Sequence, residues 1–340
     1  MSTNQSANPR ADAPGLLHGY LFGPDGRGQG LDAQAAAVWL AGGGADGFAW
    51  LHFDGGHPAT RAWLRAHVDL PEAFTETLHE AWRSTRVEQA EGGIIAVVND
   101  VVYDMDDAYA MRVATLWMVV HARAGRRYLV SLRNQPLRAV ECLRAAVDAG
   151  EEFASPLGLL VHLFGDQADV LGRIRHRVAE EVDDIEDRFL DEQIPDRSHL
   201  GRLRRDLVRM QRLLAPEPGA LFRLLEDAPD WVAEADVDGL RRSTEEFSLV
   251  LRDLSGLQER IKLLQEEVAA LTADRMNKSI FVLTAVAVVA LPINITAGLL
   301  GMNVGGIPFG RLDHGFWIVV AALALVTVAT AWVLLRRRDE

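Results

Sequence analysis

Residues 279–308 read SIFVLTAVAVVALPINITAGLLGMNVGGIP and set the architecture of the whole chain. The run 279–300 carries no charge and has the roughly 20 residues that a helix needs to cross a bilayer. A second uncharged apolar run covers residues 316–335. The loop between the two runs opens on Gly301, Met302 and Asn303, so that one asparagine is held among glycines at a membrane surface. This placement favours a pore mouth over a hinge.

Basic residues flank the two runs on one side only. Arg275 and Lys278 precede the first run, residues 336–338 are three arginines after the second, and the loop between carries only Arg311. By the positive-inside rule, both termini are cytoplasmic and the loop 301–315 faces outward. We therefore expect a multi-pass protein of an inner (plasma) membrane, with transmembrane helices at 279–300 and 316–335 and a basic cytoplasmic tail at 336–340.

The composition narrows the class of protein. The formal charge of −13 lies outside the apolar runs, which argues against a nucleic-acid partner and is compatible with divalent cations. A single cysteine, Cys142, excludes an intrachain disulfide framework and a cysteine-rich zinc site. Residues 1–14 are polar without the apolar core of a signal peptide, so we expect a disordered N-terminal tail.

The part of the chain before the membrane divides into three expected regions. Residues 15–150 mix short apolar, β-branched strands (16–22, 47–53, 93–103, 112–120, 127–132) with helices (58–67, 71–82, 136–149), as an α/β cytoplasmic domain does. The region has no phosphate loop, nucleophile elbow or HExxH motif, which predicts that the protein is not an enzyme. His52 and His57 beside Asp54 are better explained by packing than by a metal site.

Residues 151–235 form an acidic helical hairpin region, with helices at 156–194 and 196–214, a turn at Pro216 and Pro218, and a short helix at 219–227. Residues 236–278 then read as a stalk helix that continues into the first membrane run and reaches roughly 100 Å in all. A heptad seam of the kind that packs helices side by side runs along it: Leu240, Phe247, Val250, Leu254, Leu257, Ile261, Leu264, Val268 and Leu271.

One face of the first membrane helix carries polar residues at alternating steps of three and four: Asn277, Ile280, Thr284, Ala287, Leu291, Asn294 and Gly298. Asparagine at membrane depth is costly unless it meets water or another polar group. Pore lining explains two asparagines on one face, with Ile280 and Leu291 as apolar gates; hydrogen bonding between helices explains Thr284 equally well. Since one chain cannot enclose a pore, several copies must surround an axis.

The chemistry of this face favours a hydrated cation. A ring of asparagine carbonyl oxygens is neutral and can hold a divalent cation through its waters without trapping it, whereas a His/Cys cage releases zinc slowly. No Asp, Glu or His lies within either run, which leaves no intramembrane carboxylate proton relay. Cation recruitment is possible at Asp313 and His314 in the loop, and at Glu259, Glu266, Glu267 and Asp274, although solvated helix faces and turns explain these residues too.

The chain resembles the CorA-type metal-ion transporter family over residues 15–340. The resemblance rests on a cytoplasmic α/β domain, a stalk helix, and two C-terminal apolar runs with Gly301-Met302-Asn303 between them. Gly305-Gly306-Ile307-Pro308 is similar to the zinc-transporter (ZntB) branch, because Phe309 stands where the magnesium branch usually has a glutamate. The resemblance implies a CorA-like homopentameric funnel in an α+β class, with the first span lining the pore. It also implies Gly301, Met302 and Asn303 as the outer selectivity site, with Asn303 contacting the hydrated metal.

The sequence thus predicts transport of a divalent cation, zinc first, by a homopentamer in membrane lipid, with no cofactor beyond the transported ion and no nucleic-acid partner. One alternative is a magnesium or cobalt channel of the same family. An alternative of a different class is a membrane-anchored stalk scaffold that does not transport.

Overall fold

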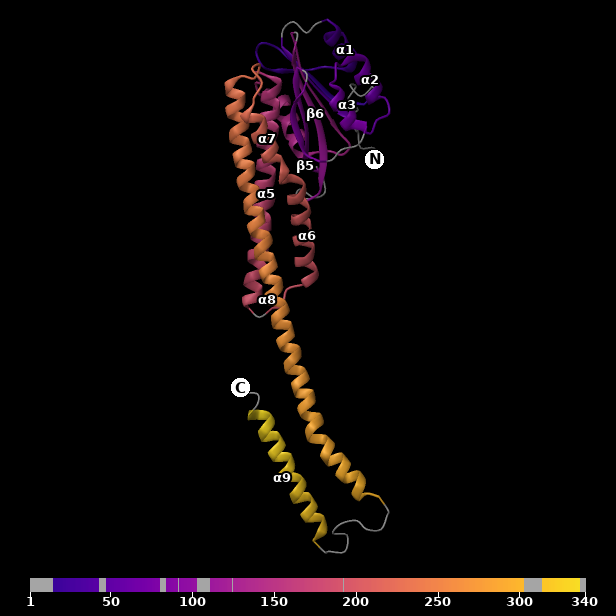
Figure 1. Cartoon of the computed structure of the whole chain (residues 1–340), viewed down its shortest axis with the longest axis vertical. Helices are drawn as coiled ribbons and strands as arrows, with labels where there is room; N and C mark the ends of the chain where they lie inside the picture. The colour runs from indigo at the N-terminus through magenta and orange to yellow at the C-terminus, as the bar shows by residue number, and fades with distance from the viewer. Residues whose placement is uncertain are drawn as a thin grey trace, which may run out of the picture. The chain divides into compact units, whose positions relative to one another are not determined.

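The computed structural model describes residues 15–42, 47–79, 84–90, 92–102, 111–123, 125–191, 193–302 and 314–336. Asn303, Asp313 and the glycine-rich segment after Asn303 therefore lie outside the described residues. The chain divides into two compact units, Met1–Leu264 and Gln265–Glu340. Figure 1 shows the strands, α1 to α7 and the first part of α8 in the first unit, and the rest of α8 with α9 in the second.

The first unit is built on a seven-stranded sheet in the order β2-β1-β3-β7-β6-β5-β4. Its strands are β1 (Leu16–Phe22), β2 (Gly28–Gly30), β3 (Phe48–Asp54), β4 (Arg86–Ala90), β5 (Gly93–Val101), β6 (Val113–Arg123) and β7 (Arg126–Arg133). The strands β4 to β7 form an antiparallel meander, and β3 pairs with β7 in parallel. All nine residues of β5 are buried, because helices cover both faces of the sheet.

Three short helices cover one face of the sheet: α1 (Ala33–Ala41), α2 (Thr60–His67) and α3 (Glu72–His79). The side chain of Asp32 starts α1 by accepting a hydrogen bond from the backbone N–H of Ala35 at 2.8 Å. Leu40, Trp63 and Phe74 pack from these helices against Leu51 and Val119 of the sheet. This face therefore has a core of its own.

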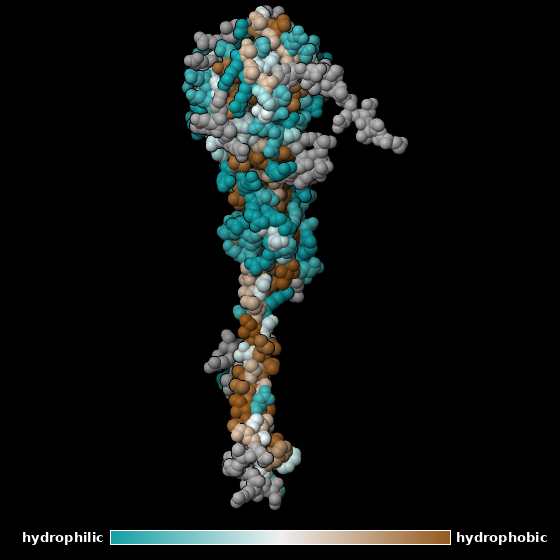
Figure 2. Space-filling view, turned by 90° about the vertical axis from the view of Figure 1, so that its right-hand side faces the viewer, coloured by the Kyte–Doolittle hydropathy of each residue, from teal (hydrophilic) through white to brown (hydrophobic). Residues whose placement is uncertain are grey.

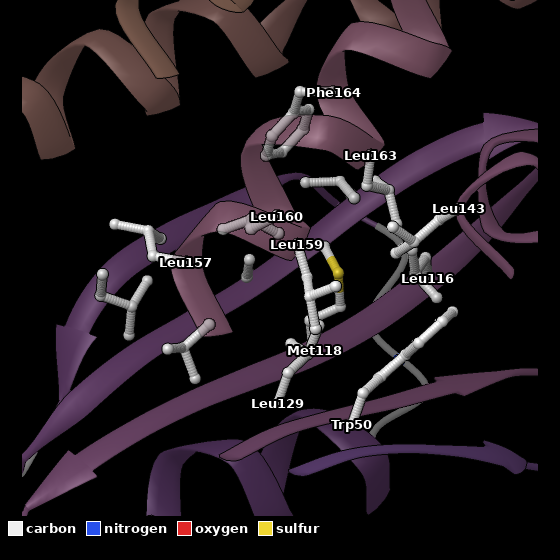
Figure 3. Packing of buried hydrophobic residues seen from close by; sticks show 14 of the residues in the cluster. Trp50, Leu116, Met118, Leu129, Leu143, Leu157, Leu159, Leu160, Leu163 and Phe164 are labelled. Carbon is white, nitrogen blue, oxygen red and sulfur yellow. The ribbon is translucent and has the colours of Figure 1, made fainter. Parts of the chain in front are cut away.

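The opposite face is covered by α4 (Arg138–Asp148), the first part of α5 (Pro156–Leu190) and α7 (Pro216–Glu226). Figure 3 shows residues of α5, such as Leu160 and Phe164, over Met118 and Leu129 of the sheet. Ser155 starts α5 by accepting a hydrogen bond from the N–H of Gly158 at 2.8 Å, with proline at the next position. The long helix is thus anchored in the core of the α/β fold.

Beyond the sheet, α5 and α6 (Arg197–Leu214) form a three-helix bundle with the first part of α8 (Glu234–Leu300). Hydrogen bonds and ion pairs join Val161 to Ser243, Arg175 to Asp253 and Asp183 to Arg260. Each pair is separated by about the same number of residues, so α5 and α8 run parallel. On α8 the bundle buries an apolar seam: Leu240, Phe247, Leu251, Leu254, Leu257, Ile261 and Leu264.

The expected heptad seam is therefore confirmed in large part, with three differences, the first being that Leu271 is only half-buried. Leu251 is buried where Val250 was expected, and Val250 is only half-buried. Thr244, which the pattern omitted, is fully buried and donates its hydroxyl proton to the carbonyl of Leu240 at 2.6 Å. The seam is wider than a strict heptad because α8 packs against two helices.

Several elements differ from the expected ones. The sequence pattern missed α1, whose alanine-rich sequence gives little amphipathic contrast, and the short edge strands β2 and β4. Residues Pro216 and Pro218 belong to the first turn of α7 and not to a preceding turn, since proline is tolerated where helix N–H groups lack partners. The helix α5 ends at Leu190, before the expected end at residue 194.

The helix α8 runs without a break from Glu234 to Leu300, through Pro292, and α9 (Gly315–Arg336) follows the loop. Both contain stretches long and apolar enough to cross a membrane, and the apolar stretch of α8 has no buried residue. Figure 2 shows hydrophobic residues over the surface of the second unit, whereas hydrophilic residues cover much of the first. An apolar surface of this extent needs lipid or other copies to cover it.

Candidate cation pathway

The seven residues expected to line a pore lie on one exposed face of α8. Asn277, Ile280, Thr284, Ala287, Leu291, Asn294 and Gly298 are all exposed. Most of the partly shielded positions of this part of α8 follow a different stripe, with Ala290 outside it: Phe281, Ala285, Val289, Pro292 and Thr296. The polar face is thus available to water or to other copies, and the described residues of its own chain leave it uncovered.

One polar side chain on this face has a hydrogen-bond partner within α8. Thr284 donates its hydroxyl proton to the carbonyl of Ile280 at 2.8 Å, within its own helix. That bond explains how a threonine is tolerated at membrane depth without a pore. The apolar residues Ile280 and Leu291 on this face are 53% and 60% exposed. The described residues therefore leave both of these large side chains largely uncovered.

The expected outer selectivity site begins where α8 ends. The N–H of Gly301 donates to the carbonyl of Ala297 at 2.9 Å, and the N–H of Met302 to that of Leu299 at 3.4 Å. A Cβ atom at position 301 would lie 3.0 Å from the carbonyl oxygen of Ala297, so glycine suits this last turn. Gly301 and Met302 thus leave the helix at its terminal turn, directly before Asn303.

The acidic residues considered for cation recruitment are all exposed on α8 but are not equivalent. Glu259 pairs with Lys262 at 2.9 Å and Asp274 with Lys278 at 2.7 Å. Glu266 lies eleven residues before Asn277, about three helical turns, and therefore shares its face. Glu267 is displaced by about 100° from Glu266. In the loop, His314 is exposed.

Across residues 15–302 and 314–336, as far as they are described, no three His, Cys, Asp or Glu side chains gather as a metal site. His52 is fully buried, and the Arg133 side chain donates to its Nε2 from Nε at 2.8 Å. Its Nδ1 therefore carries the proton and donates to Ser131 Oγ at 2.8 Å. Burial, together with Arg133 and His18, lowers the pKa of His52 well below its usual value. The prediction of packing is thus confirmed for His52, whereas His57 is exposed.

Sequence reasoning missed a buried acidic cluster behind the sheet. The carboxylate of Glu217 accepts a hydrogen bond from the backbone N–H of Asn99 and one from the Gln167 side chain, and the Gln167 amide also donates to the carbonyl of Asn99. Asp100 accepts from the N–H of Val101 at 2.7 Å and of Ala139 at 2.9 Å. The one available signal was a glutamate between two prolines, Pro216-Glu217-Pro218.

Burial sets the charge of both acids. Desolvation raises the pKa of Glu217 well above its usual value, against the hydrogen bonds from Asn99 and Gln167. It raises the pKa of Asp100 to about 7, opposed by the N–H groups of Ala139 and Val101. These groups tie β5 to the starts of α4 and α7 and lie far in sequence from the membrane face.

Comparison with known proteins identifies the relatives. A Pseudomonas aeruginosa protein named divalent cation transporter CmaX is 30% identical over 338 residues, covering 96% of this chain and 97% of that one. A solved full-length CmaX structure matches with a TM-score of 0.79 at 27% identity, covering 96% of this chain and 99% of that one. Zinc transport protein ZntB of Yersinia enterocolitica is 25% identical over 313 residues, covering 92% and 93%.

The fold and the relatives together define a class of membrane transport proteins and not of enzymes. Its parts are an α/β domain, a long helix that continues into an apolar stretch of membrane length, and a second helix of membrane length. The family model described as CorA-like Mg2+ transporter protein matches residues 45–337. The chain belongs to this family of divalent cation transporters. The divalent cations are transported substrates in such proteins and not resident cofactors.

Proposed function

We propose that the chain forms a homopentameric pore in an inner membrane and carries a hydrated divalent cation, zinc first, along the α8 face from Asn277 to Gly298. The observation that carries the proposal is that none of the seven residues of that face is buried by the described part of the chain, with Asn294 at membrane depth and Asn277 just before the apolar run. Unsatisfied amides in hydrocarbon are costly, and water in a pore removes that cost.

In this proposal the cation enters at a ring of Asn303 side chains, where Gly301 and Met302 end the helix. Neutral amide oxygens contact the first water shell, so the ion is neither trapped nor stripped of its waters. Ile280 and Leu291 form apolar rings that close the pore by excluding water. The loop faces outward and both termini lie in the cytoplasm, in keeping with the basic residues around Arg275, Lys278 and Arg336.

The choice of zinc rests on the Gly305-Gly306-Ile307-Pro308 sequence and on similarity to a protein named for zinc transport. The CmaX name specifies only a divalent cation. A magnesium or cobalt channel on the same fold is therefore the second candidate.

Metal flux into proteoliposomes, followed with a fluorescent indicator, tests the proposal. Zinc and magnesium are compared for the wild type, for Asn303→Ala, and for Ser279→Ala as a control that is displaced by about 100° from Ile280 around α8. We expect zinc flux that falls at least tenfold in Asn303→Ala and is unchanged in Ser279→Ala. Dominant magnesium flux that is lost in Asn303→Ala supports the second candidate, and no flux of either metal from an assembled oligomer supports a scaffold.

A further inference from the structure

We propose that Glu217 is a proton-binding site that fastens α7 to the sheet: the protonated side chain holds the helix in place, and loss of the proton releases it. The site lies outside the candidate cation pathway, so this inference goes beyond the proposed function and does not depend on which ion is carried. It makes the attachment of the helix that precedes α8 sensitive to pH.

The first observation is an open stretch of sheet edge next to α7. The edge strand β4 pairs with β5 only from Gly93 to Val97, and β5 continues beyond this point with no further described strand on that side. Two side chains take the place of a strand there. Glu217 accepts a hydrogen bond from the backbone N–H of Asn99, and the Gln167 amide donates to the carbonyl of Asn99. Backbone groups in a core need such partners, so Glu217 completes the sheet.

The second observation is that acids outnumber bases around this carboxyl group, which is fully buried. The described charged groups that face the cluster are one guanidinium and two further carboxyl groups: Arg138 of α4, Asp100 of β5 and Asp166 of α5. The other packed elements, α6 and β6, contribute the neutral carbonyl of Leu213 and hydroxyl of Thr115, both bonded to the Asn99 side chain. A buried charge without compensation is strongly destabilising, so this place favours a neutral acid.

The third observation is a hydrogen-bond acceptor without a donor. Gln167 Oε1 is buried and has no partner among the described residues. The amide nitrogen of the same side chain donates to Glu217 at 3.1 Å, so the unpartnered oxygen belongs to a group that contacts the acid. A carboxylate would add one more acceptor here, whereas a neutral carboxyl group brings an O–H donor. In keeping with this, burial raises the pKa of Glu217 well above its usual value.

The helix α7 is the element that the proton holds. It has 11 residues, and its N-cap residue, Ala215, makes no side-chain cap hydrogen bond. A helix this short depends on tertiary contacts, which here are Glu217 in its first turn and apolar side chains such as Leu221 and Leu224. When Glu217 gives its proton to water, opening of the first turn lets the carboxylate reach solvent. Residues 227–233 connect this helix to α8, so the opening also frees the start of α8.

The sign and size of the effect follow from linkage. In the open form the Glu217 carboxyl group is solvated and its pKa is near 4.5, whereas in the docked form the pKa is raised. The docking equilibrium of α7 therefore weakens as pH rises above about 4.5 and until the pKa of the docked form is reached. The change is at most about tenfold per pH unit for this one group.

Hydrogen exchange of the full-length protein in detergent tests this inference. Exchange is followed by mass spectrometry at pH 5 and pH 7 and is corrected for the intrinsic pH dependence of amide exchange. We expect the protection of the α7 amides to fall at least tenfold between the two pH values. The helix α2, which packs on the opposite face of the sheet, should keep its protection. Equal protection of α7 at pH 5 and pH 7 in the wild type overturns the inference.

Two matched variants assign the effect to one carboxyl group. Glu217→Gln keeps an acceptor oxygen for Asn99 and carries no charge at any pH, so its α7 protection should be the same at pH 5 and pH 7. Glu226→Gln makes the same change at an exposed position of the same helix and should keep the wild-type decline. A decline that persists in a folded Glu217→Gln protein also overturns the inference. Asn303→Ala should lose flux and keep the decline, which separates this inference from the proposed function.

Discussion

The buried carboxylate of Glu217 accepts a hydrogen bond from the backbone N–H of Asn99, with 2.5 Å between Oε1 and the nitrogen. The bond joins the first turn of α7 to the fully buried strand β5. Its second oxygen accepts from Nε2 of Gln167 at 3.1 Å, which adds α5 to the same cluster. Three elements far apart in the sequence therefore meet at one acid.

This acid predicts a pH dependence of stability. Burial raises the folded-state pKa of Glu217 above its unfolded value near 4.5, so the folded chain holds a proton that the unfolded chain has released. The free energy of unfolding therefore falls as pH rises above about 4.5, by at most about 1.4 kcal/mol per pH unit for this group. Thermal unfolding of the detergent-solubilised protein from pH 5 to 8 should show a smaller decline for Glu217→Gln. Asp100→Asn serves as a comparison. The pKa of Asp100 is raised to about 7, so this residue lowers the free energy of unfolding with rising pH only up to about pH 7.

A pair of glycines predicts opposite effects of the same substitution. At Gly93 in β5, an added Cβ atom would overlap the backbone carbonyl of Val120 on the neighbouring strand β6. Gly93→Ala should therefore destabilise the protein by about 2 kcal/mol or more. At Gly219 in α7 nothing lies within 4 Å, so Gly219→Ala should stabilise it by up to about 1 kcal/mol through helix propensity. Urea unfolding of both variants measures the contrast, and equal destabilisation would contradict it.

The ion pairs of Arg260 predict a weak, salt-dependent link between α8 and α5. Arg260 contacts Asp183 at 2.7 Å and Glu186 at 2.6 Å, with all three side chains partly exposed. Solvent screening limits such pairs to less than about 1 kcal/mol. A double-mutant cycle of Arg260→Ala and Asp183→Ala should give a coupling energy that decreases from low to high salt. A salt-independent coupling would show that the register of the helices depends on more than charge.

Two adjacent glutamates predict which side of α8 faces the pathway. Glu266 shares the face of Asn277 and Glu267 does not, although both side chains are exposed. In the flux assay, Glu266→Gln should lower zinc flux at sub-saturating zinc by at least twofold, because a carboxylate near the axis raises the local cation concentration. Glu267→Gln is the matched control and should behave as the wild type. The reverse order would place a different face of α8 toward the axis.

The periodic features of this chain were predictable because they are local. Steps of three and four residues placed Asn277, Asn294 and the residues between them on one face, and α8 exposes that face throughout. Alternating steps also predicted the seam at Phe247, Leu254 and Ile261, which the bundle buries. Their role as pore residues stays a prediction, and Asn303 lies outside the described residues.

The sequence by itself determined the two membrane-length helices, the long helix leading into the first, and the strands and helices with strong hydrophobic patterns. Only the tertiary structure decided that β3 pairs with β7 in parallel, that α5 completes the core over the sheet, and that Glu217 meets Asn99 and Gln167. Hydrophobic periodicity depends on neighbours within a few turns, so one sequence is enough to read it. Sheet order and the burial of an acidic side chain depend on contacts between distant segments, which only the folded chain brings together.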